Sequence, residues 1–332
     1  MPRRSTLPLL VVSLLTVTTS AIDLLVPAYA NPCCGDGPRM WSTLAQMPPQ
    51  DDDDDGVQIH IILNPASGPG DSPIDPNYIG VDGTGPLVDV VAATVGQTPP
   101  RPLLYGYVAT GFGARPLEDM QNDIDRYYND PSYWRGTAVR VAGIFFDEMS
   151  SATADLPLYQ SLRAYVRQQD PAAIVMANPG VAVPEEFFRT VVADTIVTFE
   201  QTALAYRTTY ESPGAWTTNY DPDRFAHLIH TTTTTMGIDE MRSIVELAQM
   251  RHVGFLYVTD DPFVVLDQDN PWDTLATFWD TLVEAVAETN NEDGGMTDDG
   301  GCVWDGLLRI LQLFGGLLEG LIELLDSVLC GR

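Results

Sequence analysis

The chain has 332 residues, of which 45% are hydrophobic and 19% are charged, and this suits one large α/β domain with short appendages. Its 46 acidic residues outnumber 17 basic ones, all of them arginines, so the formal net charge is -29. A surface this negative repels nucleic acid and anionic lipid headgroups, so we expect no nucleic-acid partner. Acid excess without lysine is typical of a salt-adapted, halophilic secreted protein, although a GC-rich genome also depletes lysine.

The amino terminus has the features of an export signal. Arg3 and Arg4 precede an apolar run from Leu7 to Val17, and small-residue cleavage sites follow at residues 19–21 and 28–30. The pattern predicts a signal peptide over residues 1–30 rather than a transmembrane span. The paired arginines suggest twin-arginine export. We therefore expect a secreted or cell-surface protein.

Four cysteines, Cys33, Cys34, Cys302 and Cys330, predict disulfides in an exported chain. Neighbouring cysteines seldom bond each other because the geometry is strained. We therefore expect the first two to pair with the last two, which ties the chain ends together. The thiols lack the CxxC spacing of zinc sites, and we expect neither a metal nor a cofactor.

The segments that flank the central domain differ from it in composition. Residues 31–56 include five consecutive aspartates, Asp51 to Asp55, and predict an acidic linker because like charges repel one another. Residues 289–301 predict a second acidic linker. Residues 302–332 have an amphipathic pattern broken by Gly315-Gly316, which predicts a helical hairpin. This hairpin would pack on the central domain, on a second subunit or on a membrane surface.

The central region, residues 57–288, alternates apolar runs with amphipathic helical patterns. The predicted strands are residues 57–63, 103–108, 141–146, 173–177, 195–199, 226–229 and 253–258. The predicted helices are residues 117–128, 155–168, 184–192, 238–251 and 274–287. Repeated alternation implies a parallel sheet, and seven strands over about 230 residues favour a (β/α)8 TIM-type barrel over an open sheet. The sequence shows no clear eighth strand.

Polar residues follow nearly every predicted strand, where the chemistry of a parallel barrel collects. The most prominent are Asp147 and Glu148, two adjacent acids at the end of a buried run. Each polar residue alone could cap a helix or hold a loop, but together they would form an acidic cleft on one face. The set comprises Asn64, Thr110, Asp147, Glu148, Asn178, Glu200, His230, Asp260 and Asp261.

Seven stretches of the central region carry a family resemblance through their order and spacing. They are residues 64–70, 106–111, 123–127, 143–148, 178–180, 199–200 and 257–261. Together they resemble the spherulation-specific family of spherulin-type (β/α)8 barrels, which includes glycoside hydrolase family 135. The resemblance implies endo-hydrolysis of an α-1,4-linked N-acetylgalactosamine polymer, with essential acids at Asp147, Glu148 and Glu200. The acidic run, the cysteines and the carboxy-terminal tail lie outside the matching region.

Glycosidic cleavage normally needs one protonated and one ionised carboxyl group. We assign Asp147 as the nucleophile or stabilising carboxylate and Glu200 as the general acid, with a pKa raised by crowding. Glu148 would orient the substrate or tune Asp147, because adjacent strand residues point to opposite faces if the alternation persists to the tip.

The other polar strand ends are expected to bind a polysaccharide substrate. These residues are Asn64, Tyr107, Thr110, Asn178, His230, Asp260 and Asp261, with Phe112, Tyr206 and Trp272 as aromatics that would either stack on sugar rings or belong to the core.

The alternative function is a non-catalytic carbohydrate-binding or matrix structural protein on the same barrel. Such a protein would have no need of Asp147 and Glu200 together. A metal-dependent hydrolase is disfavoured because the four histidines, His60, His227, His230 and His252, are scattered.

Overall fold

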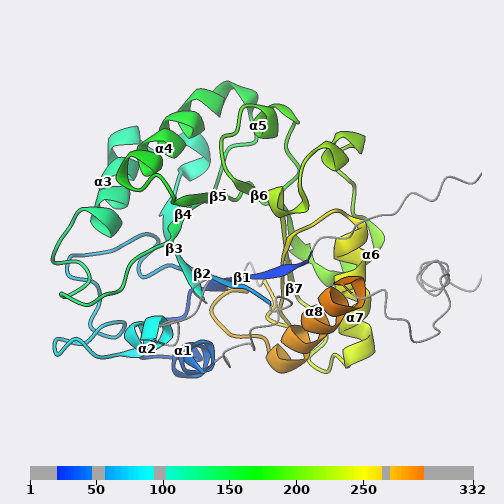
Figure 1. Cartoon of the computed structure of the whole chain (residues 1–332), viewed down its shortest axis with the longest axis horizontal. Coiled ribbons are helices and arrows are strands. Elements are labelled where there is room, and N and C mark those ends of the chain that lie inside the picture. The colour runs from blue at the N-terminus through cyan, green and yellow to red at the C-terminus, as the bar shows by residue number, and fades with distance from the viewer. Residues whose placement is uncertain (1–20, 47–56, 93–101, 264–269, 295–332) are drawn as a thin grey trace, which may run out of the picture. The chain divides into compact units, whose positions relative to one another are not determined.

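Eight parallel strands close a barrel in which every strand pairs with its neighbours in chain order (Figure 1). This computed structural model describes residues 21–46, 57–92, 102–263 and 270–294. The architecture confirms the predicted (β/α)8 barrel. The strands are β1 (Asp23–Ala28), β2 (Ile59–Leu63), β3 (Leu103–Ala109), β4 (Gly143–Asp147), β5 (Ile174–Ala177), β6 (Thr195–Thr202), β7 (Phe225–His230) and β8 (Phe255–Val258).

Helices follow the strands and cover the outside of the barrel (Figure 1). Helix α3, for example, buries Met120, Ile124 and Tyr127, the apolar side chains that recur at helical spacing. The helices are α1 (Gly37–Ala45), α2 (Pro86–Ala92), α3 (Leu117–Tyr128), α4 (Leu156–Gln169), α5 (Glu186–Arg189), α6 (Ala203–Thr208), α7 (Ile238–Met250) and α8 (Trp279–Gly294). None of the helices in the described part of the chain is long and apolar enough to cross a membrane.

The strand missing from the sequence prediction is β1, which lies inside the predicted signal peptide. Residues 24–28 pair with 59–63 of β2, and Asp23 and Leu24 pair with β8, so β1 closes the barrel. Removal of residues 1–30 would delete this strand, which corrects the expected domain boundary. The apolar residues of β1 directly follow the apolar run of the predicted signal peptide and therefore resemble part of it. Pro27 also disfavours a central strand, because proline cannot donate a backbone hydrogen bond.

The segment expected to be a linker, residues 31–56, contains helix α1. Its cysteines also differ from the expectation, because Cys33 and Cys34 form a disulfide with each other. The aspartate run at 51–55, Cys302 and Cys330 lie outside the described residues. The predicted disulfides to the carboxy-terminal cysteines are therefore wrong for Cys33 and Cys34.

At the carboxyl end, helix α8 continues to Gly294 through the first residues of the second predicted linker. The chain divides into two units, residues 1–291 and 292–332, and the barrel belongs to the first. The predicted amphipathic hairpin, residues 302–332, lies outside the described residues.

The strands are buried on both faces, as their apolar runs predict. Side chains two residues apart share a face, so Tyr107 lies on the face of Tyr105, and Asp147 on that of Phe145. The register pairs Tyr107 with Phe145, and their ring centroids are 6.4 Å apart inside the barrel. The packed rings of Tyr107 and Phe145 therefore support Asp147 at the carboxyl end of β4.

Candidate active site

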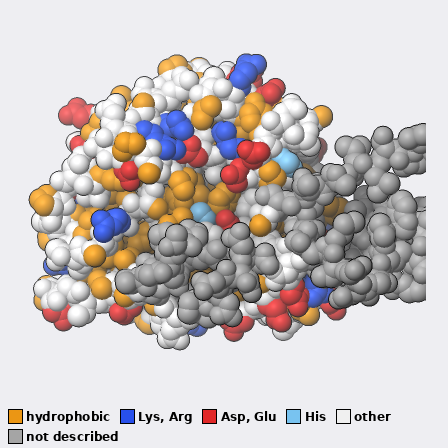
Figure 2. Space-filling model, in the orientation of Figure 1, with side chains coloured by type: hydrophobic (Ala, Val, Ile, Leu, Met, Phe, Trp, Pro, Cys, Tyr) orange, Lys and Arg blue, Asp and Glu red, His pale blue; other side chains and the backbone are white. Residues whose placement is uncertain are grey.

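A cavity of about 580 Å³ opens at the carboxyl ends of the strands. Figure 2 shows hydrophobic side chains gathered at the middle of the face in view, with a histidine and an acidic group among them. Three carboxyl groups and several aromatic rings line the cavity, and this combination is typical of small-molecule binding sites. Its lining residues are Tyr29, Asn64, Ser67, Tyr107, Asp147, Glu148, Glu200, His230, Phe263, Asn270, Pro271 and Trp272.

Asp147 on β4 and Glu200 on β6 are joined through one side chain from the intervening strand end. Asn178 Nδ2 donates to Asp147 Oδ1 at 2.9 Å and to Glu200 Oε2 at 2.7 Å. The amide cannot be flipped, because Asn178 Oδ1 accepts a hydrogen bond from the backbone N–H of Gly180 at 2.8 Å. The structure thus brings together three residues that the sequence prediction placed on separate strand ends.

Asp147 is partly exposed to the cavity, and the removal of its carboxyl group from bulk water is the main cause that raises its pKa above the ordinary value. Hydrogen bonds from the Tyr107 hydroxyl, the Glu148 backbone N–H and Asn178 oppose this rise because they favour the carboxylate. Three donors therefore stabilise the ionised form of Asp147.

Glu200 accepts fewer hydrogen bonds that favour its ionised form than Asp147 does. Burial, followed by repulsion from Asp147, raises its pKa to about 7, and hydrogen bonds from Asn178 and Trp272 lower it only in part. Trp272 Nε1 donates to Glu200 Oε1 at 3.0 Å. Glu200 therefore retains its proton to a higher pH than an ordinary glutamate does.

Glu148 also lines the cavity, which strand alternation alone would not allow. Strand β4 ends at Asp147, and Glu148 has a φ of 52°, in the left-handed region. Its carbonyl accepts hydrogen bonds from Thr110 Oγ1 at 2.6 Å and from the Phe112 N–H at 2.7 Å. This turn lets two adjacent acids face the same cavity.

The remaining predicted substrate-binding residues divide into two groups. Asn64, Tyr107 and His230 line the cavity. Burial lowers the pKa of His230, which favours the neutral imidazole, and its Nδ1 lies 2.8 Å from Thr231 Oγ1. Thr110 is fully buried and holds the Glu148 carbonyl, so it positions a cavity residue rather than lining the cavity itself.

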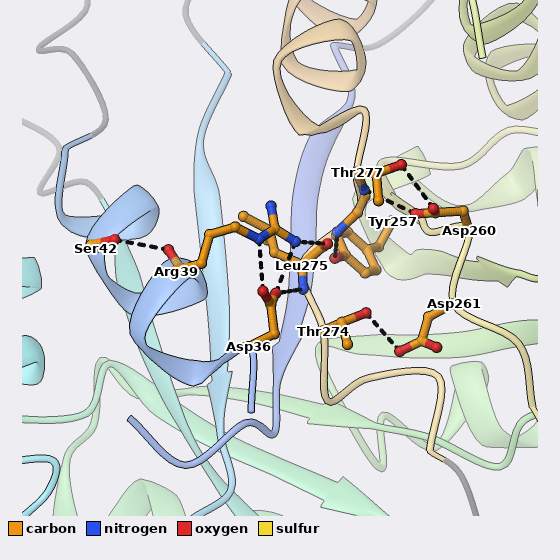
Figure 3. Close-up of polar contacts among 10 residues, drawn as sticks. Asp36, Arg39, Ser42, Tyr257, Asp260, Asp261, Thr274, Leu275 and Thr277 are labelled. Carbon is orange, nitrogen blue, oxygen red and sulfur yellow. Dashed lines mark hydrogen bonds and ion pairs between the residues drawn. The ribbon is translucent and has the colours of Figure 1, made fainter. Parts of the chain in front are cut away.

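Asp260 and Asp261 do not line the cavity, which corrects their expected role. Asp260 accepts hydrogen bonds from the backbone N–H and hydroxyl of Thr277, at 2.9 and 2.8 Å. Asp261 accepts one from the hydroxyl of Thr274 at 2.7 Å. Figure 3 shows both aspartates directed at the segment before α8. The two acids hold the loop that carries Trp272.

The sequence prediction missed Tyr29, and it left Trp272 undecided between the cavity and the core. Tyr29 was placed in the signal peptide, yet it lines the cavity and packs edge-on against Tyr107 at 5.5 Å. The apolar run of β1 was the one available signal for it. Tyr206, by contrast, is fully buried against His227, and Phe112 lies outside the cavity lining with an exposed ring.

The described residues include no cluster of three or more His, Cys, Asp or Glu side chains arranged to hold a metal ion.

Comparison with known proteins gives consistent matches. Spherulin-4 of Physarum polycephalum is 27% identical over 258 residues, covering 76% of this chain and 68% of the relative. The crystal structure of Aspergillus clavatus Sph3 in complex with GalNAc superposes with a TM-score of 0.62 at 21% identity, covering 81% of this chain and 99% of Sph3. Residues 23–286 match the description "Spherulation-specific family 4", a range that includes β1 and all eight strands. The chain therefore belongs to spherulation-specific family 4.

Proposed function

We propose that the protein is a secreted, endo-acting glycoside hydrolase that cleaves an amino-sugar-containing polysaccharide, similar to an N-acetylgalactosaminidase. The observation that carries the proposal is the pair of carboxyl groups of Asp147 and Glu200, which accept hydrogen bonds from the same amide, with the pKa of Glu200 raised to about 7. Family membership and the likeness to Sph3, whose structure contains GalNAc, support the substrate class. The proposal that the protein is secreted is based on the signal-peptide pattern, and the proposal that it is adapted to salt is based on the excess of acidic residues.

In this reaction Glu200 donates its proton to the glycosidic oxygen while the bond from that oxygen to the anomeric carbon breaks. A carboxylate oxygen of Asp147 bonds to the anomeric carbon and forms a glycosyl-enzyme intermediate. Glu200, now ionised, takes a proton from water, whose oxygen attacks the anomeric carbon and displaces Asp147. Glu148 contacts the sugar from the same side of the cavity, and Tyr29 and Tyr107 supply aromatic surface.

The spacing of the two acids favours retention of configuration. The nearest oxygens of Asp147 and Glu200 lie within 2.9 and 2.7 Å of the same nitrogen, and hence are no more than 5.6 Å apart. Retaining glycosidases place their carboxyl groups about 5–5.5 Å apart, whereas inverting ones need about 6.5–9.5 Å to admit a water molecule.

The test is cleavage of amino-sugar polymers, in high and low salt, by the wild type and by Asp147→Asn, Glu200→Gln and Glu148→Gln. We expect Asp147→Asn and Glu200→Gln to lose at least about 100-fold in kcat, because each removes a reacting group. Glu148→Gln should mainly raise KM. Glu284→Gln, an exposed acid on α8, is the matched control.

Near wild-type turnover in both Asp147→Asn and Glu200→Gln would overturn the assignment. Binding of these polymers without cleavage by the wild type would instead favour the non-catalytic carbohydrate-binding alternative.

A further inference from the structure

We propose that Trp272 is a positioning residue for the general acid, whose indole N–H aims the Glu200 proton into the cavity and stabilises the carboxylate left by proton transfer. The inference rests on the proposed function of Glu200 and adds a residue through which that function is controlled.

Both oxygens of Glu200 face nitrogen donors. Trp272 Nε1 lies 3.0 Å from Oε1, and Asn178 Nδ2 lies 2.7 Å from Oε2. Neither the indole nitrogen nor the amide nitrogen can accept a hydrogen bond. The proton of Glu200 therefore finds no acceptor in these two partners and is directed to whatever occupies the cavity, which in the proposed reaction is the glycosidic oxygen.

The backbone N–H, the carbonyl and the indole N–H of Trp272 all form hydrogen bonds. Its backbone N–H donates to Asn270 Oδ1 at 3.0 Å, and its carbonyl accepts from the backbone N–H of Tyr29 at 3.1 Å. The ring packs edge-on against His230 at 5.9 Å and also contacts Tyr257 at 6.0 Å. Only 5% of the residue is exposed, so the indole has little room to turn.

The segment that follows Trp272 is anchored residue by residue, as Figure 3 shows. The Leu275 N–H donates to Asp36 Oδ2 at 2.9 Å, and the Arg39 guanidinium donates to the Leu275 carbonyl. Thr274 and Thr277 are held by Asp261 and Asp260. Residues 272–277 are thus held by hydrogen bonds to several parts of the barrel, and they present the indole N–H from a preorganised position, as catalysis requires.

The hydrogen bond from Trp272 strengthens during the reaction. An N–H group bonds more strongly to a carboxylate than to a neutral carboxyl group, and Glu200 becomes a carboxylate as its proton leaves. Such a contact stabilises the transition state more than the bound substrate, so it acts on kcat rather than on KM. The same contact opposes the burial that raises the pKa of Glu200.

The experiment replaces Trp272 by benzothienylalanine, an isostere with sulfur in place of the indole N–H. The shape of the side chain stays the same, so water should not enter beside Glu200. The control is the same replacement at Trp134, whose indole N–H donates to the Tyr127 carbonyl at 3.0 Å on another loop.

We expect the Glu200 pKa, followed by carbon NMR of labelled glutamate with Glu200→Gln for assignment, to rise by about one pH unit at position 272 only. The kcat should fall about tenfold with KM within about twofold. The loss of kcat caused by the replacement at position 272 should be smaller for aryl glycosides with acidic leaving groups, because these substrates need less assistance from a general acid.

An unchanged Glu200 pKa, or a loss of kcat equal for all leaving groups, would overturn the role of Trp272 in an otherwise active enzyme. A wild type that cleaves no glycan would overturn the glycosidase proposal, and with it the general-acid role. The NMR measurement needs no substrate, so the two failures are distinguishable.

Discussion

Asp147 and Glu200 line the same cavity and share a hydrogen-bond donor, yet their surroundings differ in a way that suits the two proposed roles. Asp147 receives three hydrogen bonds that favour its ionised form. Glu200 receives two and is also repelled by Asp147, which holds its pKa at about 7. Two carboxyl groups in environments this different suit the proposed roles of general acid and nucleophile.

This difference predicts the shape of the pH–activity profile. Glu200 must be protonated to act as an acid, so kcat/KM of the free enzyme should fall as pH rises through about 7. The acid limb should lie above the ordinary pKa of aspartate, because burial raises the pKa of Asp147. Tyr107→Phe, which removes a donor to Asp147, should move the acid limb upward and leave the basic limb in place. An unmoved acid limb in this variant would contradict the role of Tyr107.

The same group predicts how stability depends on pH. The pKa of Glu200 is 4.5 in the reference state and about 7 in the folded protein, so the folded state binds more protons between these values. Its contribution is present below pH 4.5 and is lost as pH rises toward about 7. Between pH 4.5 and 8 the wild type should lose about 3 kcal/mol more unfolding free energy than Glu200→Gln. Urea denaturation at both pH values measures this, and parallel losses in the two proteins would contradict it.

At the scale of single elements, β4 shows how packing below the cavity fixes the acid at its tip. A Cβ atom at Gly143 would lie 1.8 Å from the backbone carbonyl oxygen of Ile174 on β5. The two strands approach closely at this point, and Asp147 lies four residues further along β4. Only glycine allows this approach, which sets the register of the acid-bearing strand.

Gly143→Ala should therefore destabilise the protein by about 3 kcal/mol and reduce kcat, because β4 must move away from β5 to relieve the contact. Gly237→Ala is the matched control, since a Cβ there meets no atom within 4 Å. Thermal unfolding of both variants measures the difference. Equal stability of the two would show that β4 and β5 separate without cost.

At the scale of the whole molecule, barrel closure depends on β1, because this strand pairs with both β2 and β8. Ile22, just before β1, is fully buried, and its backbone N–H and carbonyl bind the side chain of Asn290 on α8 at 2.8 and 3.0 Å. The two ends of the barrel domain are therefore joined at this point.

A protein that starts at Ile22 should fold, whereas one that starts at Asn31 should not, because eight strands are needed to satisfy the edges of β2 and β8. Circular dichroism and size-exclusion chromatography of the two truncated forms provide the measurement. A folded, monomeric protein from Asn31 onward would show that β1 is dispensable. Export cleavage is accordingly proposed at residues 19–21 rather than 28–30.

The sequence by itself determined most of the strands and the longer helices of this protein, but not α1, α2 and α6. Seven strands were predicted because a buried parallel strand is a continuous apolar run, and helices such as α3 because their apolar residues recur at helical spacing. The same patterns placed Asp147 and Glu200 at strand ends, where a barrel brings them to one face. Strand β1 was missed because its apolar residues continue the pattern of an export signal.

Only the tertiary structure decided which of these polar residues act together. The positive φ of Glu148 turns a second acid into the cavity, whereas Asp260 and Asp261 turn toward the loop before α8. Tyr29 and Trp272 line the same cavity as Asp147 and Glu200, although each aromatic residue is more than 70 residues away from both acids in the chain. Side-chain direction at a strand end depends on local backbone angles, and a carboxyl pKa depends on neighbours distant in the chain, so neither follows from residue order.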